Sequence, residues 1–141
     1  MVRAIIKGAG ALIEGLGVTL KYFFTRPVTM KYPEEKREPA LRYRGSHILR
    51  LDERGKERCV ACCLCATVCP AQVITIEAAE GEDHEKYPIL FEIDMGRCIF
   101  CGYCVEACPK AALVMGREYE LADYYRRDLI YDKERLIKAG K

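Results

Sequence analysis

The sequence lacks the patterns by which substrate-binding enzymes are usually recognised. Its 141 residues contain no glycine-rich phosphate loop, no dinucleotide fingerprint and no nucleophile paired with a general base. Only two histidines are present, His47 and His84, and neither has a second candidate ligand at a spacing typical of a metal site. We therefore expect no direct small-molecule substrate, no catalytic residue and no histidine ligand to a metal.

The chain also lacks an uninterrupted hydrophobic run. Residues 4–24 are largely apolar, but Lys7, Glu14 and Lys21 fall within them, and charges near the centre of a bilayer are costly. Glu14 also breaks the run that a signal peptide would need. Apolar residues recur three and four positions apart: Ile6, Ala9, Ile13, Leu16, Leu20 and Phe23. The pattern predicts an amphipathic helix over residues 1–24 that lies on a membrane or on a membrane subunit; a membrane span and a helix packed on its own domain are the alternatives.

Net charge is nearly absent, at +2, but its distribution along the chain is uneven. Residues 1–58 carry 13 basic and 7 acidic side chains, residues 59–109 carry 2 and 8, and residues 110–141 carry 8 and 6. A basic arm thus precedes an acidic core. No nucleic-acid-reading element accompanies the basic residues, so nucleic acid is not an expected partner. A partner subunit or an anionic membrane surface explains the arm better than a solvated tail does.

Cysteine, in contrast, is abundant, and its spacing repeats. Eight of the nine cysteines form two runs of the pattern C-x2-C-x2-C-x3-C-P, and each cysteine of the second run follows its counterpart by 39 residues. Two-residue gaps let a tightly turning loop aim three sulfurs inward, whereas the fourth cysteine comes after a helical turn and faces away. The spacing is typical of two [4Fe–4S] clusters in which the last cysteine of each run binds the other cluster. It indicates electron transfer.

This pattern predicts two sets of ligands to iron. Cluster 1 is expected to be held by Cys59, Cys62, Cys65 and Cys108. Cluster 2 is expected to be held by Cys69, Cys98, Cys101 and Cys104. Pro70 and Pro109 directly follow the last cysteine of each run and turn the backbone sharply there. Apolar neighbours are expected to exclude water from both clusters: Val60, Leu64, Ile99, Phe100 and Tyr103.

Zinc and disulfides are weaker interpretations of the same cysteines. Structural zinc usually takes two separated C-x2-C pairs, or pairs completed by histidine. A secreted disulfide scaffold would carry a signal peptide and would rarely repeat its cysteines at a fixed period. The ninth cysteine, Cys63, is expected to be a small apolar residue beside a cluster, because free cysteine behaves mostly as a minor hydrophobe. A substitute ligand is the alternative for this residue.

The remaining patterns predict an α+β, ferredoxin-like core with pseudo-twofold symmetry over residues 59–116. β-rich runs lie at residues 73–76, 90–93 and 113–115, so each half is expected to form a strand, a cluster loop, a short helix and a strand. Residues 77–88 are expected to be a polar insertion. Residues 25–58, rich in proline and charge, predict an extended arm that forms no core. Residues 117–141 predict a tail of helical pieces that packs on partner subunits.

Four stretches of the sequence carry a more specific resemblance: TLKYFFTRPVTMKYPEEK, RYRGSHILRLDERGKERCVACCLCATVCPAQVITIEAAE, FEIDMGRCIFCGYCVEACPKAALV and YDKERL. Together they resemble subunit I of NADH:quinone oxidoreductase, respiratory complex I, the TYKY-type ferredoxin-like subunit. The cysteine runs would fit any two-cluster ferredoxin, whereas the RPVT and RGSHIL stretches ahead of them are far more specific. Cys63 and a short C-terminal tail depart from the family pattern, and neither affects a ligand position.

The resemblance implies an electron-relay subunit of a proton-translocating enzyme. In this family two [4Fe–4S] clusters pass single electrons toward the terminal cluster of a neighbouring subunit, where quinone is reduced. The implied partners are other peripheral-arm subunits, including the terminal-cluster subunit, and a membrane-arm subunit. The implied location is peripheral, on the cytoplasmic side of the inner (plasma) membrane. Two alternatives remain: the equivalent subunit of a related ferredoxin- or hydrogenase-linked membrane complex, and a free two-cluster ferredoxin, which would have no use for a long basic arm.

Overall fold

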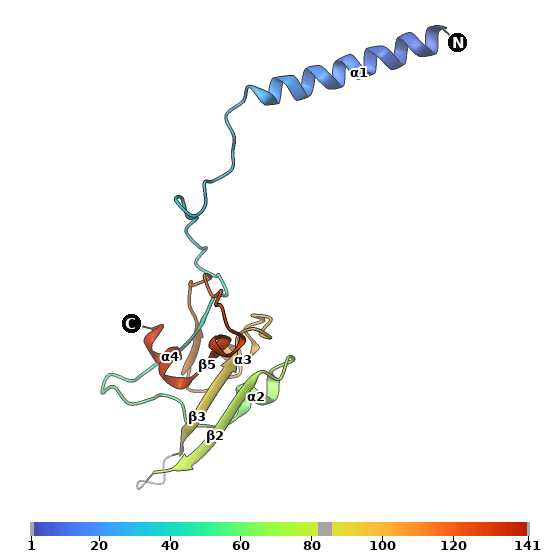
Figure 1. Ribbon diagram of the computed structural model, residues 1–141. Helices are drawn as coiled ribbons and strands as arrows, with labels where there is room; N and C mark the ends of the chain where they lie inside the picture. Colours follow the sequence, from blue (N-terminus) through green and yellow to red (C-terminus); the bar gives the residue numbers. More distant parts are fainter. Residues whose placement is uncertain (1, 82–85, 141) are drawn as a thin grey trace. The chain divides into compact units, whose positions relative to one another are not determined.

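A computed structural model describes residues 2–81 and 86–140 of the chain (Figure 1). The chain divides into two compact units, Met1–Glu38 and Pro39–Lys141. His84 lies outside the described residues.

The first unit consists of helix α1 (Val2–Phe23) and the chain that follows it. The helix confirms the sequence prediction within a residue or two at each end. Its apolar stripe is exposed within this chain, with Ile13 at 71% and Leu16 at 69% of their free surface. The stripe finds no cover among the described residues of its own unit. Among the described helices, none has the length and apolar character needed to cross a bilayer.

The second unit is a mixed α+β fold, as predicted, with two small antiparallel sheets. In one sheet β1 (His47–Leu49) pairs with β4 (Leu113–Met115). In the other, β2 (Ile74–Glu80) pairs with β3 (Lys86–Asp94), and β3 also pairs with β5 (Ile130–Tyr131). The short helices are α2 (Leu64–Val68), α3 (Tyr103–Glu106), the 3-10 turn η1 (Arg126–Leu129) and α4 (Lys133–Lys138).

The backbone follows the 39-residue repeat of the sequence. Left-handed residues occur in related pairs along the two halves: Ala61 and Phe100, Cys63 and Gly102, and Gln72 and Ala111. The two short helices begin in the same way, because the amides of Thr67 and Glu106 donate to the carbonyls of the residues four positions earlier, at 3.0 and 3.2 Å. Each half therefore forms a strand, a loop, a short helix and a strand, as the sequence predicted, and the two halves form a pseudo-twofold pair.

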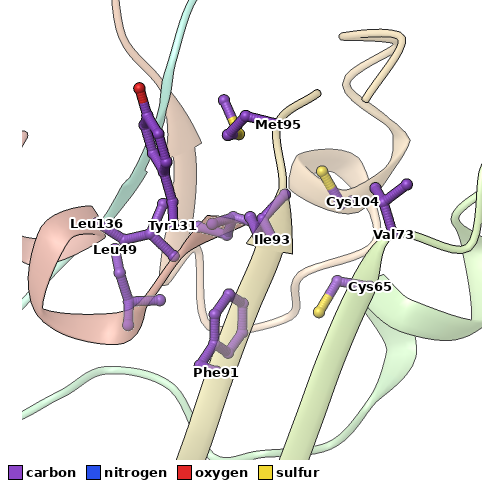
Figure 2. Close-up of a cluster of buried hydrophobic side chains, with 10 residues drawn as sticks. Leu49, Cys65, Val73, Phe91, Ile93, Met95, Cys104, Tyr131 and Leu136 are labelled. Carbon is purple, nitrogen blue, oxygen red and sulfur yellow. The ribbon is translucent and has the colours of Figure 1, made fainter. Parts of the chain in front are cut away.

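A single buried cluster joins the sheets and the short helices. In β3 the side chains alternate between the two faces of the sheet, and Phe91 and Ile93 are fully buried while Leu90 and Glu92 are only partly covered. The buried members are Leu49, Cys65, Val73, Phe91, Ile93, Met95, Cys104, Leu113, Tyr131 and Leu136. Figure 2 shows Cys65 and Cys104 together with Val73 at one edge of this cluster. Two cysteines thus belong both to the core and to the repeated cysteine runs.

The structure differs from three of the predictions about segments of the chain. The arm predicted over residues 25–58 was wrong in its last part, since β1 forms there and His47 and Leu49 are buried. The polar insertion predicted at residues 77–88 is strand at both of its ends, because β2 continues to Glu80 and β3 begins at Lys86. The C-terminal tail contains helical pieces as expected, but Leu136 and Tyr131 pack into the chain's own core rather than being left for a partner.

Candidate iron–sulfur site

Two cavities lie at the ends of the cysteine loops, and each is lined by the predicted ligands of one cluster. The first, with about 360 Å³ of empty space counting the part open to solvent, contains the four cysteines predicted for cluster 1 together with Cys63. Its walls include Leu49, Ile76, Phe91 and Leu113. The second, of about 320 Å³, contains the four cysteines predicted for cluster 2, with His47, Val73, Ile74 and Ile93 among its walls. We call these cavity 1 and cavity 2.

The linings of the two cavities correspond position by position. Every residue between 59 and 65 that lines cavity 1 has a counterpart 39 positions later, between 98 and 104, that lines cavity 2. The same step converts Cys69, Ala71, Val73 and Ile74 of cavity 2 into Cys108, Lys110, Ala112 and Leu113 of cavity 1. The fourth cysteine of each run therefore lines the cavity of the other run.

The local backbone explains this exchange. Cys65 lies within α2, and the helix ends at Val68, directly before Cys69, whose φ of −69° and ψ of 112° are extended rather than helical. The chain then runs through Pro70 toward β2 and away from the loop that it has just formed. In the second run, Cys104 lies within α3, and Cys108 follows the end of that helix by one further residue. The fourth sulfur is thereby separated from the first three by a change of backbone direction.

Burial and the proximity of other thiols raise the pKa of four of the cysteines, which favours their neutral forms before any metal binds. Burial raises the pKa of the Cys65 thiol to about 11, and nearby Cys59 and Cys108 contribute to the increase. Burial likewise raises the pKa of the Cys104 thiol to about 12, with Cys98 as the next contributor. The pKa of Cys59 is raised chiefly by burial and also by Cys108, and that of Cys98 chiefly by burial and also by Cys69. The fourth cysteine of each run is thus close enough to raise the pKa of a cysteine in the other run.

Backbone amides add hydrogen bonds to some of the sulfurs. The amide of Phe100 donates to Cys98 Sγ at 3.4 Å, and that of Ala112 donates to Cys108 Sγ at 3.3 Å. Hydrogen bonds to the sulfurs are one of the means by which proteins set the potential of an iron–sulfur cluster.

The donor set fits a pair of cubane clusters. Cavity 2 offers four cysteines, and cavity 1 offers four cysteines of the repeat together with Cys63, so each holds at least the four ligands that a [4Fe–4S] cluster takes, one for each iron. Among residues 2–81 and 86–140, no three His, Cys, Asp or Glu side chains converge closely enough to hold one single ion. When bound, such clusters accept and release one electron at a time. The eight cysteines of the repeat would hold the clusters as thiolates, and the residues around them supply two largely apolar walls.

The apolar walls differ in part from those that the sequence predicted. Val60 and Ile99 line cavities 1 and 2 as expected, but Ile99 is also 63% exposed. Leu64 and Tyr103 are 47% and 51% exposed and line neither cavity. The more enclosed walls come from the strands, at positions such as Phe91. Sequence reasoning assigned the walls to the nearest neighbours of the cysteines, whereas the strand pairing brings distant residues closer.

His47 and Cys63 also lie at the cavities. His47 is 1% exposed, and its Nε2 lies 3.5 Å from Cys104 Sγ. Burial lowers the pKa of this imidazole. Cys63 is half-buried in the wall of cavity 1, and its Sγ lies 3.5 Å from the carbonyl oxygen of Ala61. The sequence predicted that Cys63 lies beside a cluster but gave His47 no place in the site. The sequence did not predict that β1, which carries His47, is buried.

Comparison with known proteins agrees with this geometry. Residues 58–118 match the family described as "4Fe-4S dicluster domain". The chain is 54% identical over 127 residues to NADH-quinone oxidoreductase subunit I 2 of Geobacter metallireducens, a match that covers 90% of this chain and 96% of that protein. It is 46% identical over 133 residues to NADH-quinone oxidoreductase subunit 9 of Thermus thermophilus, covering 90% and 73%.

A solved structure gives a further comparison. One chain of the membrane-bound sulfane sulfur reductase, an archaeal respiratory membrane complex, is 38% identical and superposes with a TM-score of 0.56. The match covers 78% of the present chain and 55% of that chain. From the sequence relatives, the matched domain and the two cysteine-lined cavities together, we conclude that the chain belongs to the NADH-quinone oxidoreductase subunit I family and that its cofactors are two [4Fe–4S] clusters.

Proposed function

We propose that this chain passes single electrons between two [4Fe–4S] clusters on their way to quinone within NADH-quinone oxidoreductase. Cys59, Cys62, Cys65 and Cys108 hold cluster 1. Cys69, Cys98, Cys101 and Cys104 hold cluster 2. The observation that carries the assignment is the correspondence of the two cavities, in which the fourth cysteine of each run lines the cavity of the other. Because each helix contributes sulfur to one cluster and leads directly to a ligand of the other, the two clusters are held close together.

The protein's part in the relay is to keep both clusters fixed and dry on their inner sides. Cys65 and Cys104 are the two buried ligands, and both belong to the same hydrophobic cluster as Phe91 and Ile93. A packed interior holds side chains in single rotamers, so the distance between the clusters stays constant during electron transfer. The low polarity of these walls also limits water, whose access is one of the factors that set cluster potential.

Exposed apolar side chains on both loops support contact with partner subunits. Leu64 and Val68 are exposed on the first loop and helix, and Ile99 and Tyr103 on the second. Exposed apolar groups gathered on one part of a protein commonly mark a surface that another protein covers. We assign these surfaces to the neighbouring peripheral-arm subunits from which electrons arrive and to which they leave, the terminal-cluster subunit included.

The N-terminal helix supports attachment at a membrane. Its exposed stripe includes Ile6, Ile13 and Leu20, while Lys7, Glu14 and Lys21 belong to a second stripe with the same spacing. A helix of this kind lies with its apolar face at the interface of a bilayer or against a membrane protein. We assign it to the membrane-arm subunit and the anionic surface on the cytoplasmic side of the inner membrane, as a peripheral attachment.

The second candidate function is the equivalent electron relay in a related respiratory membrane complex. The similarity to a chain of the sulfane sulfur reductase favours it, since that chain resembles this one in both sequence and fold. The relatives whose matches cover more of both chains are, however, named as NADH-quinone oxidoreductase subunits. We therefore place the relay in NADH-quinone oxidoreductase ahead of the relay in a related complex.

The test is to replace Cys65 by alanine in the chromosomal copy and to assay isolated membranes. Quinone reduction driven by NADH is expected to fall to background, because the relay is broken. Reduction of ferricyanide by NADH is expected to persist, since this small acceptor can take electrons before they reach the relay. The matched control is Cys63→Ala, which should retain both activities. Membranes in which Cys65→Ala leaves NADH-driven quinone reduction intact would contradict the proposal, and loss of a ferredoxin-driven activity alone would favour the second candidate.

A further inference from the structure

A fully buried polar side chain, His47, lies against cavity 2 and not against cavity 1. His47 lines cavity 2, is 1% exposed, and places its Nε2 3.5 Å from the Sγ of Cys104, within the distance expected for a hydrogen bond to sulfur. From this geometry we propose that His47 donates a hydrogen bond from Nε2 to Cys104 and raises the reduction potential of cluster 2. The inference rests on the proposed function for the assignment of Cys104 to that cluster.

The position equivalent to His47 at the other cluster is occupied by phenylalanine. In the first sheet His47 lies opposite Met115 and Leu49 lies opposite Leu113. In the second, Phe91 lies opposite Ile76 and Ile93 lies opposite Ile74. Since Ile76 and Ile74 precede Met115 and Leu113 by the 39-residue repeat, the register makes Phe91 the counterpart of His47.

Two backbone hydrogen bonds confirm this register. The amide of Arg50 donates to the carbonyl of Ala112 at 2.7 Å, and the amide of Asp94 donates to the carbonyl of Val73 at 3.0 Å. Ala112 and Val73 are related by the repeat, so Arg50 and Asp94 are equivalent, and the residues three positions before them are His47 and Phe91. Phe91 correspondingly lines cavity 1. The two cavities therefore differ at this position by one imidazole.

The chemistry of a thiolate fixes the direction of the hydrogen bond. A cysteine bound to iron has no proton to donate, so the contact forms only when the proton is on Nε2 of the imidazole. Nδ1 then presents a lone pair. Among the described residues this buried Nδ1 has no hydrogen-bonding partner, so no competing acceptor holds a proton there.

The surrounding backbone holds the ring in place. The amide of Gly45 donates to the carbonyl of Gly116 at 3.0 Å, and the amide of Gly116 donates to the carbonyl of Ser46 at 2.7 Å, so the strand is fixed on the N-terminal side of His47. The imidazole also lies beside the ring of Phe100, with centroids 6.0 Å apart. Because the imidazole is fixed in this way, its Nε2 can donate to Cys104 Sγ in both redox states without a change in the position of the ring.

The hydrogen bond favours the reduced state of cluster 2. Reduction adds one negative charge, and part of that charge resides on the ligand sulfurs, where a donor stabilises it. Hydrogen bonding to the sulfurs is accordingly one of the factors that set cluster potential. If the contact favours reduction by about tenfold, its loss lowers the potential by about 59 mV, because that is the value of one tenfold step for a one-electron couple.

The experiment is a redox titration of the full-length chain, reconstituted with iron and sulfide in detergent and followed by electron paramagnetic resonance. His47→Phe copies the residue found at cluster 1, and His47→Gln keeps an N–H donor. The signal of cluster 2 is identified as the one lost in Cys101→Ala. We expect His47→Phe to lower the midpoint of cluster 2 by about 59 mV, the shift for a tenfold step, and to leave that of cluster 1 unchanged, with His47→Gln restoring part of the difference. An unchanged midpoint of cluster 2, or an equal shift in both clusters, would overturn the inference.

A measurement on the unsubstituted residue guards against a variant that fails to fold. His47 and His84 are the only histidines, so His84→Gln leaves His47 as the single site of nitrogen-15 labelling with histidine. Pulsed resonance of the reduced protein should then show a nitrogen-15 coupling on the cluster 2 signal alone. Its absence from that signal would overturn the inference. If instead Cys101→Ala and Cys104→Ala abolished different signals, the ligand assignment of the proposed function would be wrong. This outcome differs from those that would overturn the role of His47 alone.

Discussion

Cys63 and Gly102 occupy equivalent positions in the two cluster loops and share a left-handed backbone, with φ of 59° and 81°. Each of them precedes the first residue of a short helix. A residue other than glycine has a cost of roughly 1–2 kcal/mol in this conformation. The first loop therefore carries a strain that the second avoids.

Replacing Cys63 by glycine is expected to be tolerated and to leave both clusters in place, because the change relieves the backbone and removes no ligand. The purified variant should contain about eight irons per chain, as two cubanes require, and should retain the wild-type visible spectrum. A loss of about half the iron would show that Cys63 is a ligand.

The reciprocal change, Gly102→Ala, is expected to destabilise the second loop. The new methyl group would lie 3.3 Å from Arg44 Nε and 3.4 Å from Arg44 Cζ, in addition to the strain at a φ of 81°. Arg44 is held there because its guanidinium donates to the carbonyl of Cys101. We predict a lower temperature for the thermal loss of cluster absorbance than in the wild type. An unchanged transition temperature would argue that the loop can relax freely.

The C-terminal helix is predicted to stabilise the domain through Leu136, which is fully buried in the core next to β1 and β3. Leu136→Ala should destabilise the chain by about 2–5 kcal/mol, the usual cost of such a truncation in a core. The measurement is the denaturant midpoint, followed by cluster absorbance. Lys138→Ala, an exposed change in the same helix, is the control and should shift the midpoint little.

Cluster binding is predicted to release protons. Thiols are mostly protonated at pH 7 even at their ordinary pKa, and burial raises the pKa of Cys65 and Cys104 to about 11 and about 12, so both keep their protons in the metal-free folded chain at pH 7 and well above it. The cluster binds thiolates, so these protons must leave when it forms. Reconstitution in weak buffer with a pH indicator should release fewer protons in Cys104→Ala than in the wild type. Cys63→Ser is the control, and a reduced release in that variant would contradict the ligand assignment.

The apolar stripe of α1 is predicted to hold the chain at the membrane. Leu16→Asp places a charge in the stripe, whereas Gly17→Asp places the same charge in the neighbouring polar stripe. We expect the first variant to shift from the membrane fraction to the supernatant after cell lysis and the second to remain. Equal partition of the two variants would show that this face of the helix does not carry the attachment.

The cysteine spacing predicted the iron–sulfur chemistry because ligand geometry depends on local chain length. The same spacing fixes the left-handed residues and the short helices, which recur 39 residues apart, and thus much of the cluster-binding fold could be deduced from it. The strand that carries His47 could not. A three-residue strand has no periodicity of its own, and its place is set by pairing with residues 113–115, far along the chain.

The tail shows the same limit. Its aromatic and aliphatic residues predicted packing, but the sequence holds nothing to tell whether the partner is the chain's own core or another subunit. The tertiary fold shows that Leu136 packs on the chain's own core, beside β1 and β3. No local sequence pattern carries that information. The apolar walls of the cavities were missed for the same reason, since Phe91 and Ile76 reach cavity 1 through the register of β2 and β3.

The central claim is that the fourth cysteine of each run belongs to the other cluster, and three alanine variants test it directly. Cys65 and Cys108 lie 43 residues apart in the sequence, whereas Cys65 and Cys69 lie only four apart. Electron paramagnetic resonance of the reduced variants should show that Cys65→Ala and Cys108→Ala lose the same signal, and that Cys69→Ala loses the other. If Cys65→Ala and Cys69→Ala lose the same signal while Cys108→Ala loses the other, each run binds its own cluster, and the exchange of the fourth cysteine between the two runs is wrong.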